Sequence, residues 1–120
     1  LGQHSAAPGT AMYGKLFEHF VFQELHAYLE YRQRDEPLRF WGTHSGPEVD
    51  FVVGDDIAIE VKAKTLVNEQ DIKGLEALSK ETRLRRRIVV SQDRDRRTLR
   101  GVDVYPYRAF LSELWSDAIV

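Results

Sequence analysis

Apolar residues recur at every third or fourth position from Met12 to Leu29, a spacing that predicts an amphipathic helix of about four to five turns. Pro37 ends any helix before it, because proline lacks the amide hydrogen that a helix interior requires. Residues 1–11 are small and polar, so we interpret them as a linker or a cloning remnant before a single domain at 12–120. The predicted helical stripe comprises Tyr13, Leu16, Phe17, Phe20, Val21, Leu25, Tyr28 and Leu29.

Shorter apolar runs separated by turn residues follow, which is typical of strands. Asn68 is a suitable cap for a second helix, and Pro106 suits the first turn of a last helix. The order helix, three strands, helix, strand, with an added strand and helix, predicts an α/β domain. We expect strands at 38–43, 48–53, 57–64, 87–91 and 101–105, and helices that bury Ile72, Leu75 and Leu78, then Phe110, Leu111, Leu114 and Trp115.

Composition narrows the class of protein. Seventeen Lys and Arg against nineteen Asp and Glu give a net charge of −2, which argues against a generally polycationic binder. The absence of cysteine excludes a disulfide scaffold, a thiolate zinc site and a cysteine nucleophile. No apolar run approaches the ~20 residues of a membrane span, and no signal peptide is visible. We therefore expect a cytoplasmic protein that does not enter a membrane.

Acidic residues stand where the pattern of strands predicts apolar ones. Strand alternation puts Glu48 and Asp50 on one side of the second strand, with Val49, Phe51 and Val53 opposite. In the third strand the same rule puts Glu60, Lys62 and Lys64 together. A hairpin of these strands gathers the acids on one face of the sheet, where a carboxylate is costly unless it is paired or bound to metal.

Glu18 adds a third acid, because it lies beside the apolar stripe of the first helix and should face the sheet. Carboxylate and carbonyl oxygens are the ligands that Mg²⁺ prefers. Asp50, Glu60 and the backbone carbonyl of Val61 are thus candidate ligands for Mg²⁺ or Mn²⁺, Glu18 could hold a second ion or orient water, and Lys62 could position water or stabilise a phosphoryl group. The alternative is an ordinary solvated strand face, since a Glu-x-Lys triplet is common in strands.

Taken in order, the helical Glu18, the strand Glu48-Val49-Asp50 and the strand Ile59-Glu60-Val61-Lys62 resemble the PD-(D/E)xK nuclease superfamily. The closer resemblance is to the C-terminal domain of unknown function attached to many prokaryotic AAA-type ATPases. The motifs that carry it are Gly14 to Glu18, Trp41 ahead of Glu48 to Phe51, Glu60-Val61-Lys62, Val89-Val90-Ser91, and Tyr105-Pro106 ahead of Phe110-Leu111.

This resemblance implies a restriction-endonuclease-like αβββαβ core with a mixed sheet flanked by helices. It also implies Asp50 and Glu60 as metal ligands, Lys62 as the catalytic lysine and Glu18 as the helix acid. One departure from the superfamily pattern is that Pro47 is not adjacent to Asp50. A second is the lack of a GxxxxGK[ST] loop, so this chain cannot hydrolyse ATP by that route even if an AAA-type ATPase module belongs to the parent chain.

A basic segment between Arg83 and Arg100 holds eight arginines against two aspartates. With Lys64, the residues Arg85, Arg86 and Arg87 are candidates for nucleic-acid backbone contacts, with DNA favoured over RNA and no base-reading motif. The alternative is a solvated face whose charge is compensated elsewhere. Two functions therefore stay open: a metal-dependent phosphodiesterase, or a non-catalytic module that docks nucleic acid or protein. A homodimer that covers an edge strand is compatible with either.

Overall fold

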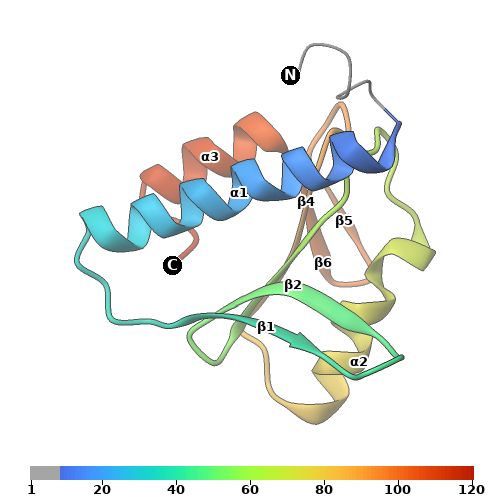
Figure 1. Cartoon of the computed structure of the whole chain (residues 1–120), viewed down its shortest axis with the longest axis horizontal. Helices are drawn as coiled ribbons and strands as arrows, with labels where there is room; N and C mark the ends of the chain where they lie inside the picture. Colours follow the sequence, from blue (N-terminus) through green and yellow to red (C-terminus); the bar gives the residue numbers. More distant parts are fainter. Residues whose placement is uncertain (1–8) are drawn as a thin grey trace.

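Three α-helices, one 3₁₀ helix and six strands follow one another in residues 9–120, the part of the chain that the computed structural model describes (Figure 1). The elements are α1 (Ala11–Tyr31), β1 (Leu38–Gly42), β2 (Glu48–Val53), β3 (Ile57–Val61), the 3₁₀ helix η2 (Glu69–Ile72), α2 (Lys73–Glu81), β4 (Arg86–Ser91), β5 (Arg97–Leu99), β6 (Val102–Pro106) and α3 (Tyr107–Trp115).

The strands form one mixed sheet in the order β1-β2-β3-β4-β6-β5. β2 runs antiparallel to both of its neighbours, β1 and β3. β3, β4 and β6 are parallel, and β5 pairs antiparallel with β6. α1 and α3 cover one face and α2 covers the other (Figure 1). The predicted α/β class, with a mixed sheet flanked by helices and an added C-terminal strand and helix, is confirmed.

The buried side of α1 is narrower than the sequence pattern suggested. Leu16 and Phe20 are 38% and 57% exposed, so their assignment to the buried stripe was wrong, and Met12, one turn before them, is 48% exposed. They repeat every four residues and form a second row, which a helix lying on a sheet and one neighbouring helix leaves in solvent. The residues that α1 does bury are Phe17, Val21, Leu25, Tyr28 and Leu29.

Several element boundaries also differ from prediction. β3 ends at Val61 rather than Lys64, because the Lys64 N–H turns back to the Lys62 carbonyl at 2.8 Å. The short β5 was not predicted at all. Asn68 caps η2 rather than α2: its side chain accepts the Gln70 N–H at 2.9 Å. Leu111 and Trp115 of α3 are half-buried rather than buried.

Two close contacts fix the positions of α1 and β2, the elements that carry Glu18 and Asp50. The Tyr28 hydroxyl donates to Asp117 Oδ1 at 2.7 Å, which ties α1 to the segment after α3. On the other face, α2 packs so near β2 that a Cβ on Gly74 would lie 2.0 Å from the Glu48 carbonyl oxygen. Only glycine permits this approach.

The predicted linker 1–11 lies mostly outside the described residues. Within them, the Thr10 side chain accepts the Tyr13 N–H at 3.1 Å and caps α1, which begins at Ala11. The boundary of the domain stays a prediction. Within residues 9–120, no helix has both the length and the apolar character needed to span a membrane.

Candidate active site

β2 and β3 separate at one end of their hairpin, and two carboxyl groups fill the gap. The antiparallel register runs from Val53↔Ile57 to Phe51↔Ile59. Beyond it, the Asp50 N–H donates to Glu60 Oε1 at 2.9 Å, and the Val61 N–H donates to Asp50 Oδ2 at 2.8 Å. The two side chains therefore replace ladder hydrogen bonds, and each holds the main chain of the opposite strand.

The separation coincides with a change of face in β2. Strict alternation predicts Val49, Phe51 and Val53 on one side, but Val49 packs in the α2-side core while Phe51 and Val53 pack in the α1-side core. That part of the sequence prediction was wrong. The strand turns over at Asp50, which is why its carboxyl group can reach β3 instead of projecting from one face.

Burial and a neighbouring acid raise the pKa of Glu60 well above its ordinary value of 4.5. The side chain is only 7% exposed, and loss of hydration is the largest cause, followed by the hydrogen bond and charge of Asp50. Lys62 Nζ lies 3.8 Å from Glu60 Oε2 and opposes the shift. Two carboxyl groups this close cannot both ionise without added positive charge.

α1 brings Glu18 and Lys15 to the same place. Burial, and secondly the charge of Asp50, raise the pKa of the half-buried Glu18, while Lys15 acts in the opposite direction. Lys15 was not among the predicted site residues, although its position three residues before Glu18 on a helix predicts that the two side chains are neighbours.

A cleft of about 390 Å³ opens over these groups. All four predicted catalytic residues line it, together with Val61. Gly14 also lines it, and a Cβ added there would meet nothing within 4 Å, so a methyl group would project into open space. The full lining is Gly9, Thr10, Ala11, Gly14, Lys15, Glu18, Glu48, Asp50, Glu60, Val61, Lys62 and Ala63.

The donor set suits a hard cation held by few protein ligands. Asp50 and Glu60 each commit one oxygen to a backbone N–H, which fixes the carboxyl group and leaves a second oxygen. Mg²⁺ often takes only one or two carboxylates and keeps several waters. In the described part of the chain, no group of three or more His, Cys, Asp or Glu side chains is arranged to hold a metal ion. Val61 contacts Asp50 through its N–H, and the ligand role of its carbonyl stays a prediction.

The residues predicted to bind nucleic acid lie elsewhere, as the described lining of the cleft includes none of them. Lys64 Nζ pairs with Asp71 Oδ2 at 2.8 Å. Arg86 is in register with Ile57, at the opposite end of β3 from Val61, so Arg85–Arg87 lie far along the sheet from the acids. Their contact with nucleic acid stays a prediction.

Most arginines of the basic segment have acidic partners. Arg85 pairs with Asp56 at 3.4 Å, and Arg86 pairs with Asp103 at 3.1 Å. Three further pairings are Arg96 with Glu113, Arg97 with Asp93, and Arg100 with Glu69 and Glu76. These ion pairs agree with the alternative that the sequence left open, a solvated face whose positive charge is compensated by acids.

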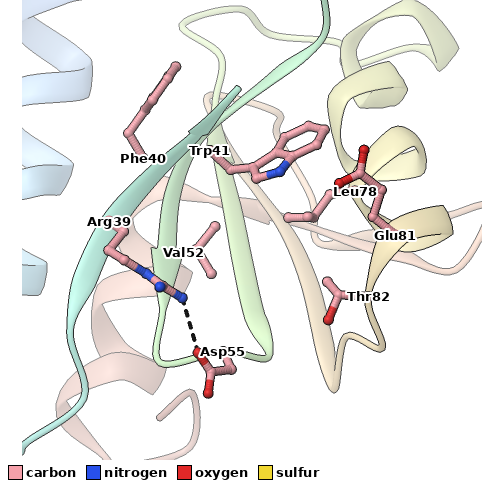
Figure 2. Close-up of a pocket in the computed structure, with 8 residues that line it drawn as sticks. All are labelled: Arg39, Phe40, Trp41, Val52, Asp55, Leu78, Glu81 and Thr82. Carbon is pink, nitrogen blue, oxygen red and sulfur yellow. Dashed lines mark hydrogen bonds and ion pairs between the residues drawn. The ribbon is translucent and has the colours of Figure 1, made fainter. Parts of the chain in front are cut away.

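A second pocket, of about 520 Å³, lies between β1–β2 and α2 (Figure 2). Its lining includes Trp41 and Leu78, and its rim carries an ion pair between Arg39 and Asp55 at 3.0 Å. It shares no lining residue with the acidic cleft. We therefore place the candidate chemistry at the acids rather than here.

Residues 13–110 match a protein family described as a domain of unknown function (DUF4143). No curated protein matches the chain significantly. No solved structure does so either. The family match runs from the first turn of α1 into α3 and includes Glu18, Asp50, Glu60 and Lys62.

Proposed function

The chain belongs to the DUF4143 family of domains of unknown function, and we propose that it is a metal-dependent phosphodiester hydrolase of the PD-(D/E)xK type. One observation carries the proposal: Asp50 and Glu60 face each other across the gap between β2 and β3, in a cleft that also holds Lys62 and Glu18. A buried, under-neutralised acid pair in an accessible cleft is typical of functional sites. The αβββ order, followed by α2 and a parallel β4, supports a restriction-endonuclease-like core.

Asp50 and Glu60 would hold Mg²⁺ or Mn²⁺, with the Val61 carbonyl as a further ligand, and Glu18 would either hold a second ion or orient water. When bound, the ion supplies Lewis-acid activation of water and neutralises charge on a phosphoryl oxygen. The hydrogen bonds from the main chain keep both carboxyl groups in place, so the site needs little reorganisation.

The reaction is hydrolysis. Water oxygen forms a bond to phosphorus, the bridging P–O bond breaks, and a proton released by the water ends on the departing oxygen or in solvent. Glu18 accepts a hydrogen bond from the attacking water and orients it beside the acid pair. Lys62 Nζ, beside Glu60, donates to a non-bridging phosphoryl oxygen, where negative charge grows in the transition state.

The test is cleavage of single- and double-stranded DNA with Mg²⁺ or Mn²⁺ by the wild type, Glu60→Ala and Lys62→Ala. We expect each substitution to reduce the rate by about 10²–10³-fold, as is usual when a transition-state contact is removed. Thermal unfolding of each variant excludes loss of the fold. Cleavage that survives both substitutions would contradict the proposal.

The second candidate is a non-catalytic docking module that keeps the same fold. The absence of a three-residue metal-binding group among residues 9–120 favours it. Calorimetric titration with Mn²⁺ separates the two: heat that disappears in Asp50→Asn supports hydrolysis, whereas no heat at millimolar metal supports the module.

We further propose that the domain acts on nucleic acid in the cytoplasm, as the C-terminal part of an AAA-type ATPase or as a free-standing relative. DNA is favoured over RNA, with contacts to the backbone. The motifs from Gly14 to Leu111 support the ATPase association. The unpaired outer edge of β1, at the end of the described sheet, is compatible with a homodimer.

A further inference from the structure

One wall of the acidic cleft continues into exposed aromatic rings. Along α1, Lys15, Glu18 and Phe22 are spaced by three and four residues, so they share one face of the helix. Phe22 is 37% exposed and therefore offers part of its ring to solvent just beyond Glu18. Its centroid lies 6.0 Å from that of Phe51, which follows Asp50 directly in the chain.

Histidine rings extend this aromatic surface. The Phe22 ring lies nearly parallel to those of His19 and His26, its neighbours along α1, with centroid distances of 6.3 and 5.8 Å and interplanar angles of 22° in both cases. Phe51 beneath Phe22 is buried, whereas His19, Phe22 and His26 are all exposed. The three rings therefore form an exposed aromatic row along α1 next to Glu18.

A second exposed ring, Phe40 of β1, lies near the cleft residue Glu48 and also borders the second pocket. Figure 2 shows Trp41 directed toward Leu78 of α2, while Phe40 points to the other side of β1. The Phe40 ring lies over Gly42: a Cβ on Gly42 would be 2.7 Å from Phe40 Cζ and 2.9 Å from the Cβ of Glu48, a residue that lines the cleft. Phe40 is 61% exposed.

Two lysines also line the cleft. Lys62 follows β3, and Lys15 lies one turn before Glu18 on α1. Along this helix face, Lys15 and Phe22 therefore lie on opposite sides of Glu18. Neither lysine is within 4.0 Å of a carboxylate other than Glu60 among the described residues. Phosphate would therefore meet ammonium groups on one side of the acids, and flat apolar groups would meet Phe22 and Phe40 on the other.

A single-stranded nucleic acid has this combination of groups, because its backbone is anionic and its bases are free to stack on protein rings. In a duplex the base faces are already occupied by neighbouring pairs. We propose, resting on the proposed hydrolase function, that the substrate is single-stranded nucleic acid whose phosphate binds near Lys15 and Lys62 and whose neighbouring bases stack on Phe22 and on Phe40. Stacking tolerates every base, so no sequence preference is expected.

The experiment measures binding in EDTA, so that no cleavage occurs, by the fluorescence anisotropy of three labelled DNA probes. These are a mixed-sequence single strand, the same sequence as a duplex, and an abasic strand of equal length. Wild type should bind the base-bearing strand about tenfold tighter than the abasic strand, since base–aromatic stacking tightens binding by about that factor per base. Equal affinity for the two strands overturns the proposal without any variant.

Variants then assign the effect to the rings. Phe22→Leu and Phe40→Leu keep apolar volume, and each should weaken binding of the base-bearing strand by about fivefold or more while leaving the abasic strand unchanged. Phe20→Leu is the matched control: Phe20 is 57% exposed on the same helix but lies two residues from both Glu18 and Phe22, on another face. An equal loss in Phe20→Leu, or an equal loss for all probes, overturns the proposal.

The outcome separates this inference from the hydrolase itself. Base-dependent binding that needs Phe22 and Phe40, with no cleavage in Mn²⁺, supports stacking and contradicts hydrolysis. Cleavage of single strands by the wild type that Phe22→Leu and Phe40→Leu leave unchanged contradicts stacking and supports hydrolysis.

Discussion

The two ends of the parallel β3–β4 pair carry charge in opposite ways. At one end, Arg86 donates to Asp103, to the Tyr105 hydroxyl and to the Ala118 carbonyl, each at 3.1 Å. At the other end, Glu60 is buried against a second acid, and its nearest cation is 3.8 Å away among the described residues. The first end is an internally satisfied ion-pair network, and the second is an acid pair with only Lys62 within 4.0 Å among the described residues.

This difference shows why a count of charges along the sequence misplaces a site. The basic segment holds eight arginines against two aspartates, yet five of these arginines pair with acids in the described part of the chain, four of them with acids outside the segment. The cleft has fewer charged groups, but its acids outnumber its lysines. We therefore expect a ligand to bind at the end whose charges are less completely paired.

The largest expected effect is the pH dependence of the free energy of unfolding that Glu60 causes. Because the pKa of Glu60 is raised in the folded protein, the folded state keeps a proton on Glu60 at pH values where the unfolded chain has released it. The contribution of Glu60 to the free energy of unfolding is therefore complete below about pH 4.5 and is lost as pH rises through the folded-state pKa. Without metal, the free energy of unfolding of the wild type should fall between about pH 5 and 8. Glu60→Gln should reduce that fall by more than ~1 kcal/mol, since one pKa unit corresponds to about 1.4 kcal/mol.

Urea denaturation across this pH range, in EDTA, gives the measurement. The shifted pKa of Glu18 acts in the same direction, so a shallower slope should remain in the variant. Parallel curves for wild type and Glu60→Gln would show that Glu60 is not buried against Asp50 as described.

At the arginine end, a stability effect without a functional effect is expected. Arg86→Met removes the donor to Asp103 and should lower the free energy of unfolding by about 2 kcal/mol, because Arg86 is only 20% exposed and makes charged hydrogen bonds. Arg85→Met, at an exposed pair, should change it by less than ~0.5 kcal/mol. Chemical denaturation measures the free energy of unfolding of both variants. A lower rate of DNA cleavage in either variant would contradict the purely structural role of this end.

Binding of a nucleic acid should depend on lysines rather than arginines. The double variant Lys15→Ala, Lys62→Ala should bind labelled single-stranded DNA on the order of tenfold more weakly. The slope of log affinity against log salt should fall by about 1.4, because each phosphate neutralised by a lysine adds about 0.7 to that slope. Arg85→Ala with Arg87→Ala serves as the matched pair. If the arginine pair reduces the salt slope instead, the polyanion binds at the other end of the sheet.

The smallest effect is expected at Gly14. Alanine fits there without a clash and favours the helix, so Gly14→Ala should raise the free energy of unfolding by roughly 0.5 kcal/mol. Its methyl group would enter the cleft, so DNA binding and cleavage should fall. Gln23→Ala, an exposed position on the same helix, should alter neither property much. A Gly14→Ala variant that is stabler and equally active would show that substrate does not approach this part of α1.

Local sequence patterns predict much of this fold, because apolar periodicity and turn residues act over a few positions. The order of helices and strands, and the convergence of Glu18, Asp50, Glu60 and Lys62 on one cleft, follow from such patterns. The gap between β2 and β3 does not. It depends on a face change at Asp50, and alternation rules assume a regular strand.

Pairing partners that are distant in the chain were also beyond prediction. Arg86 meets Asp103, and Arg96 meets Glu113, only after the sheet and α3 have assembled. The exposure of Met12, Leu16 and Phe20 has a similar origin, since it depends on how much of α1 the sheet and α3 cover. Sequence spacing identifies the apolar residues of a helix but does not show how many faces of that helix pack against other elements.

The hydrogen bonds that Asp50 and Glu60 accept from the main chain give these two acids a structural role that is separate from any reaction. Each side chain accepts a backbone N–H at the end of the hairpin, so a relative that exchanged either acid would lose part of its architecture whether or not it hydrolyses a substrate. The side chains of Lys62 and Glu18 make no comparable bond to the main chain in the described part of the protein. If the proposed hydrolysis holds, relatives in which Lys62 and Glu18 vary while Asp50 and Glu60 persist are expected to have the scaffold without the chemistry.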